Sequence, residues 1–181
     1  MLILASKSPR RKELLSLITE DFIIKTADVD ETLPAKITPW EAVEYLSQIK
    51  AEPFKSDEDI VIGADTVVAV DGTILGKPSD RENAFAMLKM LSGKEHSVFT
   101  GVTVIKGEKS STFSVETRVK FFDLSNEEIN AYLDTGEPFD KAGGYGIQGK
   151  GSLLIEKING DYFNVVGLPI SALNRCLEDF K

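Results

Sequence analysis

An apolar run in the first half of the chain constrains the fold more than any other stretch. Residues 59–70 (DIVIGADTVVAV) are almost continuously apolar and rich in β-branched side chains. Such a run is typical of a strand that is buried on both faces, as in the sheets of α/β proteins. Asp65 interrupts the run, and the small residues Gly63 and Ala64 before it would let another backbone or a ligand come close. A buried carboxylate is costly without a partner or a metal, so Asp65 is either functional or a hydrogen-bonded structural aspartate.

A strand, a turn and a helix are predicted at the start of the chain. Residues 2–5 (LILA) predict a buried strand, Ser8 is a suitable helix N-cap, and Pro9 then falls at the first helical position. The same turn carries four cationic side chains: Lys7, Arg10, Arg11 and Lys12. A helix start already has partial positive charge, so a bound anion, and phosphate above all, would relieve the conflict. The alternative is a solvated basic turn.

Size and charge narrow the class of protein. The 181 residues are enough for a single domain, 1–181, with a substantial core. The formal net charge of −8 argues against a nucleic acid polymer as the main partner and favours a small phosphorylated ligand.

Residue types narrow the chemistry. Cys176 and His96 are the only cysteine and histidine, which excludes a disulfide framework, a cysteine zinc site and a His-rich metal site within one chain. Any general base is therefore expected to be a carboxylate or a lysine. The sequence shows no signal peptide and no apolar run of membrane-spanning length, which predicts a cytoplasmic protein without a membrane partner.

An acidic loop precedes the second predicted helix. Residues 28–31 (DVDE) place three carboxylates close together. Carboxylate oxygens are the ligands that Mg²⁺ prefers, so this loop could hold the ion, with a solvent-exposed acidic turn as the alternative.

Two lysines are candidate phosphate ligands. A capping box at residues 38–41 (TPWE) starts a helix that ends near Lys50. Lys50 is most simply a favourable charge at the helix C-terminus, and it could also reach a phosphate. Lys77 is held between glycine and proline in residues 76–78 (GKP).

The remaining pattern predicts a mixture of helices and strands. We expect a strand at 22–24, a turn at Asp71-Gly72, a helix at 80–92, antiparallel strands at 96–105 and 112–122, a capped helix from Ser125, a hairpin of strands 153–158 and 162–166, and a last helix ending near Phe180. Asn159-Gly160 is the signal for the second hairpin.

A glycine-rich segment covers residues 140–151 (DKAGGYGIQGKG) and holds five of the 14 glycines. Such backbone freedom has an entropic cost, which is tolerated where the backbone approaches a ligand or turns tightly. The segment is not a Walker loop, because no Gly-Lys-Ser/Thr follows at the right spacing. Gln148 can donate and accept hydrogen bonds at once, as recognition of a base edge requires.

Several short segments occur together in one order along the chain. They are 6–11 (SKSPRR), 30–32 (DET), 63–66 (GADT), 76–78 (GKP), 140–143 (DKAG) with 145–149 (YGIQG), and 157–160 (KING) with 166–169 (VGLP). In this combination the chain resembles the Maf family of nucleoside triphosphate pyrophosphatases over nearly its whole length.

The resemblance implies an α/β fold related to the inosine triphosphate pyrophosphatases, with a mixed, elongated and twisted sheet flanked by helices and two lobes with a central cleft. It also implies hydrolysis of a nucleoside triphosphate to the monophosphate and pyrophosphate with a divalent metal, Mg²⁺ or Mn²⁺, and a homodimer. The segment around Gln148 resembles the branch that acts on dTTP and UTP, rather than the branch that acts on 7-methyl-GTP.

The resemblance also implies residue roles. Asp65 matches the proton acceptor that activates water, and Glu31 matches a position expected to bind metal or phosphate. Our hypothesis is that Asp65 and Glu31 together hold the metal ion. The positions linked to substrate choice are Arg10, Thr66 and Gln148, and the phosphate-binding candidates are Ser8, Arg11, Lys50 and Lys77. The hypothesis is that Asp65 takes a proton from water that attacks the α-phosphorus while the cations neutralise the phosphate oxygens.

Two other functions use the same features. A regulatory nucleotide-binding protein without turnover, linked to cell division or septum control, would use the basic turn but would not require Asp65. A house-cleaning enzyme for inosine or xanthosine triphosphate would differ in base preference.

Overall fold

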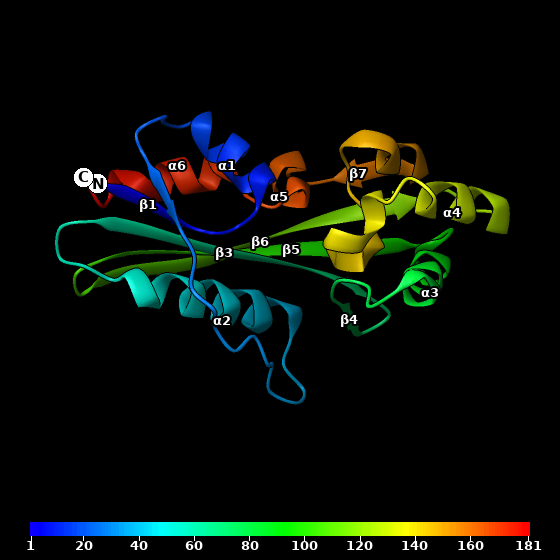
Figure 1. Ribbon diagram of the computed structural model, residues 1–181, viewed down its shortest axis with the longest axis horizontal. Helices are drawn as coiled ribbons and strands as arrows, with labels where there is room; N and C mark the ends of the chain where they lie inside the picture. The colour runs from blue at the N-terminus through cyan, green and yellow to red at the C-terminus, as the bar shows by residue number, and fades with distance from the viewer. The chain divides into compact units, whose positions relative to one another are not determined.

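A seven-stranded sheet organises the chain, and the computed structural model describes residues 1–181 (Figure 1). The strands are β1 (Leu2–Ala5), β2 (Ile23–Lys25), β3 (Ile60–Val70), β4 (Thr73–Leu75), β5 (Glu95–Lys106), β6 (Lys109–Phe121) and β7 (Ile155–Asn159). Their order is β2-β1-β3-β5-β6-β7, and β4 pairs with β3. Parallel and antiparallel pairs both occur, so the predicted mixed sheet is confirmed.

Six α-helices flank the strands, which confirms the α/β class. They are α1 (Pro9–Ser16), α2 (Pro39–Ala51), α3 (Arg81–Leu91), α4 (Asn126–Leu133), α5 (Tyr162–Val166) and α6 (Ile170–Glu178). Short 3-10 helices cover Glu52–Phe54, Glu137–Asp140, Ala142–Gly144 and Gly149–Leu154. None of the helices combines the length and apolar character that crossing a bilayer requires.

The chain divides into two compact units. The first comprises residues 1–66, 100–115 and 167–181, and the second comprises residues 67–99 and 116–166. Strands β3, β5 and β6 contribute residues to both units.

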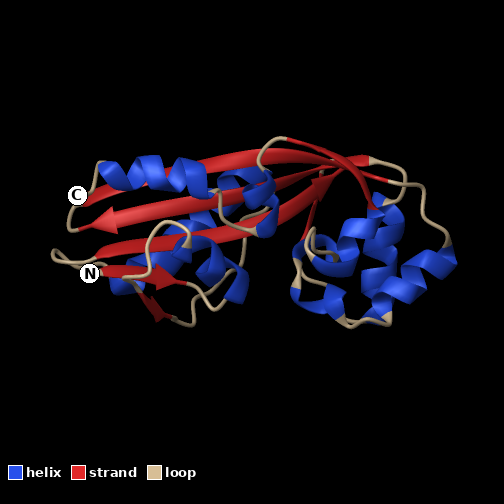
Figure 2. Ribbon diagram, turned by 90° about the horizontal axis from the view of Figure 1, so that it is seen from above, coloured by secondary structure: helices blue, strands red, loops and turns tan.

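The first unit is built on parallel strands. β1 pairs in parallel with β2 and with β3, and the β1–β3 register runs from Leu2 opposite Ile60 to Ala5 opposite Gly63. Helix α2 covers one face of these strands, and α1 and α6 cover the other face (Figure 1). Both chain ends belong to this unit and lie near the same end of its strands (Figures 1 and 2).

The predicted helix starts in the first unit are confirmed. The Ser8 side chain accepts a hydrogen bond from the Arg11 N–H, and Pro9 follows at the first helical position. Thr38 and Glu41 form a full capping box, which satisfies donors that a helix start otherwise leaves unpaired.

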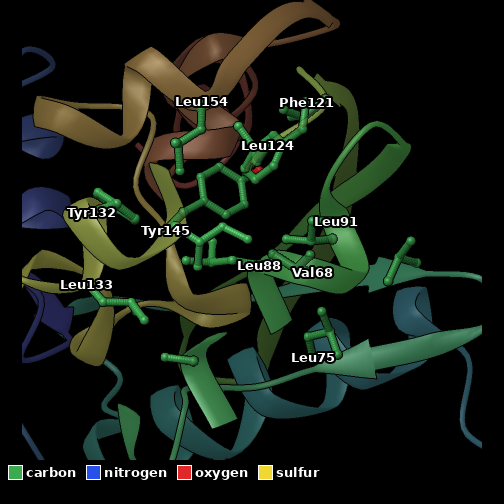
Figure 3. Packing of buried hydrophobic residues seen from close by; sticks show 14 of the residues in the cluster. Val68, Leu75, Leu88, Leu91, Phe121, Leu124, Tyr132, Leu133, Tyr145 and Leu154 are labelled. Atoms are coloured by element: carbon green, nitrogen blue, oxygen red, sulfur yellow. The ribbon is translucent and has the colours of Figure 1, made fainter. Parts of the chain in front are cut away.

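The second unit has its own apolar core. Buried side chains from β3, α3, β6, α4 and the glycine-rich segment pack together, among them Leu88, Leu91 and Tyr145 (Figure 3). The predicted turn at residues 71–72 joins β3 to antiparallel β4, with positive φ angles of 48° at Asp71 and 76° at Gly72. The Ser125 capping box at the start of α4 is also confirmed.

The predicted hairpin of strands 153–158 and 162–166 is wrong. Residues 155–159 form β7, which pairs with β6, but Tyr162–Val166 is helix α5. Two contacts override the β-propensity of these residues. Asp161 Oδ1 accepts a hydrogen bond from the Phe163 N–H at 2.8 Å, and the buried Asn164 amide donates to the Val98 carbonyl at 3.1 Å.

Candidate active site

The early end of β1 leaves part of β3 without a parallel neighbour on that side. β1 stops at Ala5, opposite Gly63, whereas β3 continues to Val70. Asp65 and Thr66 therefore lie just beyond the last parallel pair, after Ala64. In open α/β sheets, ligands bind beyond the carboxyl ends of the strands, so this place is a natural site for ligand chemistry.

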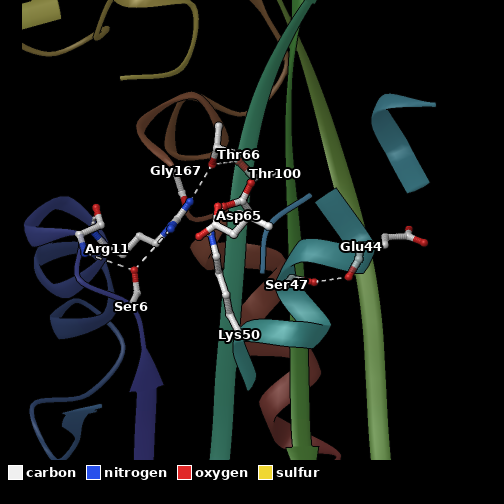
Figure 4. A network of polar contacts seen from close by, with 11 residues as sticks. Ser6, Arg11, Glu44, Ser47, Lys50, Asp65, Thr66, Thr100 and Gly167 are labelled. Atoms are coloured by element: carbon white, nitrogen blue, oxygen red, sulfur yellow. Dashed lines mark hydrogen bonds and ion pairs between the residues drawn. The ribbon is translucent and has the colours of Figure 1, made fainter. Parts of the chain in front are cut away.

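Neighbouring residues of β3 face opposite helices, because side chains alternate along a strand. Asp65 pairs with Lys50 of α2, and Thr66 pairs with Arg11 of α1 (Figure 4). One short segment of strand thus carries polar contacts on both faces.

Lys50 joins the two carboxylates that the sequence nominated as a metal site. Its Nζ pairs with Asp65 Oδ1 and lies 3.2 Å from Glu31 Oε1. The Asp65 and Lys50 side chains are only 13% and 17% exposed, whereas the Glu31 side chain is 56% exposed. The Asp65–Lys50 pair is therefore held in a mostly dry environment, and Glu31 reaches it from the solvent side.

Arg11 makes a forked set of contacts inside the first unit. Its Nε donates to the Gly167 carbonyl at 2.8 Å and its Nη2 donates to Thr66 Oγ1 at 3.0 Å. Its Nη1 donates to Ser6 Oγ at 3.4 Å, and Thr66 Oγ1 lies 2.9 Å from Thr100 Oγ1. The guanidinium therefore ties α1 to β3 and to the turn before α6, in addition to supplying charge.

Charges around Arg11 form one electrostatic group. Burial lowers the pKa of Arg11, Asp65 and Glu31 oppose that shift, and the like charge of Arg10 adds to it. A guanidinium stays charged even so, because its ordinary pKa lies far above neutrality. The site thus has three cationic side chains, two arginines and a lysine, and two carboxylates. Its net charge is positive, which favours binding of an anion.

The other predicted residues are placed as follows. Ser8 caps α1, and its backbone N–H donates to Ser6 Oγ at 3.2 Å. Arg10 lies on the first turn of α1 and is partly buried. Lys77 and Gln148 belong to the second unit, where both side chains are exposed.

A sequence model of the family described as "Maf-like protein" matches residues 1–180. The chain belongs to the Maf family. The predicted resemblance is therefore confirmed over nearly the full length.

Curated Maf relatives share about half of their residues with this chain. A protein named dTTP/UTP pyrophosphatase from Bacillus pumilus is 51% identical over 181 residues, covering 99% of this chain and 96% of its own length. One of the same name from Thermosipho africanus is 56% identical over 178 residues, covering 98% of this chain and 92% of its own length.

Two solved structures share the fold of this Maf protein. The Staphylococcus aureus Ham1 protein superposes with a TM-score of 0.58 at 16% identity, covering 99% of both chains. A HAM1 protein from Coxiella burnetii gives a TM-score of 0.55 at 11% identity, covering 98% of both chains. These likenesses support the fold class.

The donor chemistry of Asp65 and Glu31 fits a divalent metal. Two carboxylates converge on the single ammonium of Lys50, so their oxygens already meet at one cationic point. Carboxylate oxygens are suitable ligands for Mg²⁺ and Mn²⁺, and Mg²⁺ usually takes only one or two from the protein and keeps several waters. This Maf protein thus offers a carboxylate pair of the required kind.

Sequence reasoning missed three partners of the site residues. Ser6, Thr100 and the Gly167 carbonyl each contact Arg11 or Thr66. Ser6 and Gly167 both lie in the family segments, which was the one available signal. No local pattern identified Thr100, because its contact joins residues 34 positions apart in the chain.

Proposed function

We propose that this protein hydrolyses dTTP and UTP to the monophosphate and pyrophosphate. The observation that carries the proposal is the position of Asp65 where the β1–β3 pairing ends, with Lys50 and Arg11 on either side of the strand. The choice of nucleotide is supported by relatives of that name at 51% and 56% identity over nearly the full chain.

Asp65 is the proposed proton acceptor. Its carboxylate takes a proton from a water molecule as the water oxygen bonds to the α-phosphorus. The bond between the α-phosphorus and the α–β bridging oxygen breaks, and its electron pair leaves on pyrophosphate. Burial of Asp65 strengthens its interactions with neighbouring charges, because fewer water molecules screen them.

The cations have the role of neutralising charge that builds on phosphate oxygens. Phosphoryl transfer depends mainly on positioning and on such charge stabilisation. Arg10 and Arg11 can each engage phosphate through two parallel hydrogen bonds, whereas Lys50 acts as a point charge. Glu31 and Asp65 would hold a divalent metal, Mg²⁺ or Mn²⁺, which supplies further positive charge beside the phosphates. Ser8 and Lys77 are further candidate phosphate ligands.

Base choice is proposed to depend on Arg10, Thr66 and Gln148. Gln148 can pair with O4 and N3–H of uracil or thymine together, because its amide both accepts and donates. A cytosine base presents an amino group and an unprotonated N3 instead, so a Gln148 amide that is held in the orientation for uracil or thymine would be left unpaired. Unpaired groups of this kind give strong discrimination between substrates.

The test is an assay of pyrophosphate release from a panel of nucleoside triphosphates in the presence of Mg²⁺. We expect the wild-type protein to release pyrophosphate from dTTP and UTP. Asp65→Asn should lower kcat at least about a hundredfold while nucleotide binding persists, since a positioned base contributes that much or more. The matched control is Asp57→Asn, an exposed aspartate of the same unit, which should keep wild-type turnover.

Three results would contradict the proposal. Near wild-type turnover by Asp65→Asn would exclude Asp65 as the general base. Release of no pyrophosphate from any nucleotide would favour the regulatory nucleotide-binding alternative, and a preference for inosine or xanthosine triphosphate would contradict the pyrimidine assignment. The single domain, the cytoplasmic location, the homodimer and the absence of nucleic acid and membrane partners stay predictions.

A further inference from the structure

Glu137 binds the backbone at the end of the glycine-rich segment of the second unit. It begins the 3-10 helix Glu137–Asp140, and its carboxylate accepts three hydrogen bonds. Oε1 accepts from the Gly151 N–H and the Tyr132 hydroxyl, both at 3.0 Å, and Oε2 accepts from the Lys150 N–H at 3.1 Å. One side chain therefore fixes the backbone just after Gln148.

Tyr132 fixes the backbone just before Gln148. Its side chain is only 4% exposed, and its hydroxyl oxygen accepts a hydrogen bond from the Gly146 N–H at 3.2 Å. Because the same hydroxyl donates to Glu137, the two residues act as one anchor. Gln148 is exposed and lies two residues from each fixed position, Gly146 and Lys150.

Two glycines of this segment leave room for the contacts that Glu137 and Tyr132 make. A Cβ on Gly149 would lie 2.8 Å from Glu137 Oε2, and a Cβ on Gly151 would lie 2.8 Å from the Tyr132 hydroxyl oxygen and 2.0 Å from the Gly146 carbonyl oxygen. A side chain at either position would therefore displace Glu137, Tyr132 or the Gly146 backbone from its place. The sequence-based expectation of tight turning is thus explained by contacts within the unit, with no ligand needed.

The charge of Glu137 is stabilised in place. Partial burial raises its pKa, but the N–H groups of Gly151 and Lys150, the Tyr132 hydroxyl and the charge of Lys141 together bring the pKa below its ordinary value. Hydrogen bonds to a charged acceptor are roughly twice as strong as neutral ones. An ionised Glu137 therefore holds the segment more firmly than a neutral side chain of the same shape would.

We propose that Glu137 is a positioning residue for substrate choice, which with Tyr132 holds the loop that presents Gln148 to the nucleotide base. The inference rests on the proposed function of Gln148 in base choice. It assigns Glu137 no contact with substrate and no part in the hydrolytic step.

The test compares Glu137→Gln with the control Glu127→Gln. Glu127 is an exposed residue of α4, and its substitution removes the same charge from the same unit. The glutamine amide replaces one accepting oxygen by a donor, so at least one backbone N–H loses its partner. We expect the ratio of kcat/KM for UTP to kcat/KM for CTP to fall roughly tenfold or more in Glu137→Gln, which corresponds to the loss of one charged hydrogen bond. Glu127→Gln should keep the wild-type ratio.

A double-mutant cycle separates positioning from general destabilisation. If Glu137 acts through Gln148, then adding Glu137→Gln to Gln148→Ala should change the ratio no further. Amide hydrogen exchange of residues 146–151 gives a readout independent of activity, and it should become faster in Glu137→Gln than in Glu127→Gln. A merely structural role would predict additive effects in the cycle.

The possible outcomes are distinguishable. If wild type and Glu127→Gln discriminate between UTP and CTP while Glu137→Gln keeps the full ratio, the inference is wrong and the proposed function stands. If wild type releases no pyrophosphate from pyrimidine nucleotides, the proposed function itself is wrong. Should Glu137→Gln fail to fold, Tyr132→Phe decides, because it removes the partner of the Gly146 N–H, and an unchanged ratio there overturns the inference.

Discussion

Arg11 shows at the residue scale that a cation of the candidate site also holds the fold together. Its guanidinium donates to Gly167, Thr66 and Ser6, and a lysine ammonium cannot reproduce that planar fork. We expect Arg11→Lys to lower the free energy of unfolding by about 2 kcal/mol, as for loss of hydrogen bonds from a charged donor. Urea denaturation measures this. The control is Arg175→Lys on the exposed surface of α6, which should change stability by less than about 0.5 kcal/mol. Equal effects of the two substitutions would show that the hydrogen bonds of the Arg11 guanidinium do not stabilise the fold.

The sequence indicated individual candidate residues but not how they pair in the structure. Asp65 was conspicuous because a carboxylate interrupts an apolar run, and Lys50 because it ends a well-capped helix. That Lys50 lies between Asp65 and Glu31 depends on how α2 packs on β3, and no local pattern encodes such packing. The position of Glu31 could not be predicted from hydrophobic periodicity either, because Glu31 lies on an exposed loop and loops have no regular pattern of apolar residues.

Helix α2 approaches its sheet closely at two glycines, and this approach sets the position of Lys50 at the element scale. A Cβ on Gly63 of β3 would lie 2.2 Å from the Ser47 carbonyl oxygen, and one on Gly101 of β5 would lie 2.2 Å from the Val43 carbonyl oxygen. Gly63→Ala must push α2 outward, so we expect a loss of about 1–3 kcal/mol in the free energy of unfolding together with reduced turnover. Thermal denaturation and the pyrophosphate assay measure the two effects. The control is Gly76→Ala, where an added Cβ has nothing within 4 Å and stability should hold. If Gly63→Ala were as stable as that control, the close packing would be refuted.

Element boundaries were predictable where side chains act on their own helix. Thr38 with Glu41 and Ser125 with Glu128 form capping boxes in the structure, and a capping box depends only on residues three apart. The helix at Tyr162–Val166 was missed because one of the two contacts that stabilise it is distant in sequence. The Asn164 amide donates to Val98 and Thr117, from strands far away in sequence, and that burial outweighs the β-propensity of the segment.

At the scale of the whole molecule, the question is whether the two units unfold together. Strands β3, β5 and β6 each place residues in both units, so breaking one unit interrupts strands that the other needs. The single domain, 1–181, stays a prediction, and it implies that the two units unfold together. A probe in one unit should therefore report a change of stability that originates in the other unit. Trp40, the only tryptophan, lies in the first unit, and His96, the only histidine, lies in the second.

His96 provides the required change of stability through pH. Its side chain is 3% exposed, its Nε2 lies 2.6 Å from the Tyr145 hydroxyl, and its Nδ1 has no partner. Burial lowers its pKa from 6.5 to about 4, so between these values the unfolded chain binds a proton that the folded chain does not. The free energy of unfolding is therefore highest above pH 6.5 and falls as the pH drops, by about 2 kcal/mol between pH 7 and pH 5.

Urea denaturation followed by Trp40 fluorescence should show this loss in the wild type, and His96→Gln should remove most of it. If far-UV circular dichroism showed the loss but Trp40 fluorescence did not, the two units would be unfolding separately. A wild-type slope equal to that of His96→Gln by both probes would instead mean that the buried histidine takes up its proton without cost.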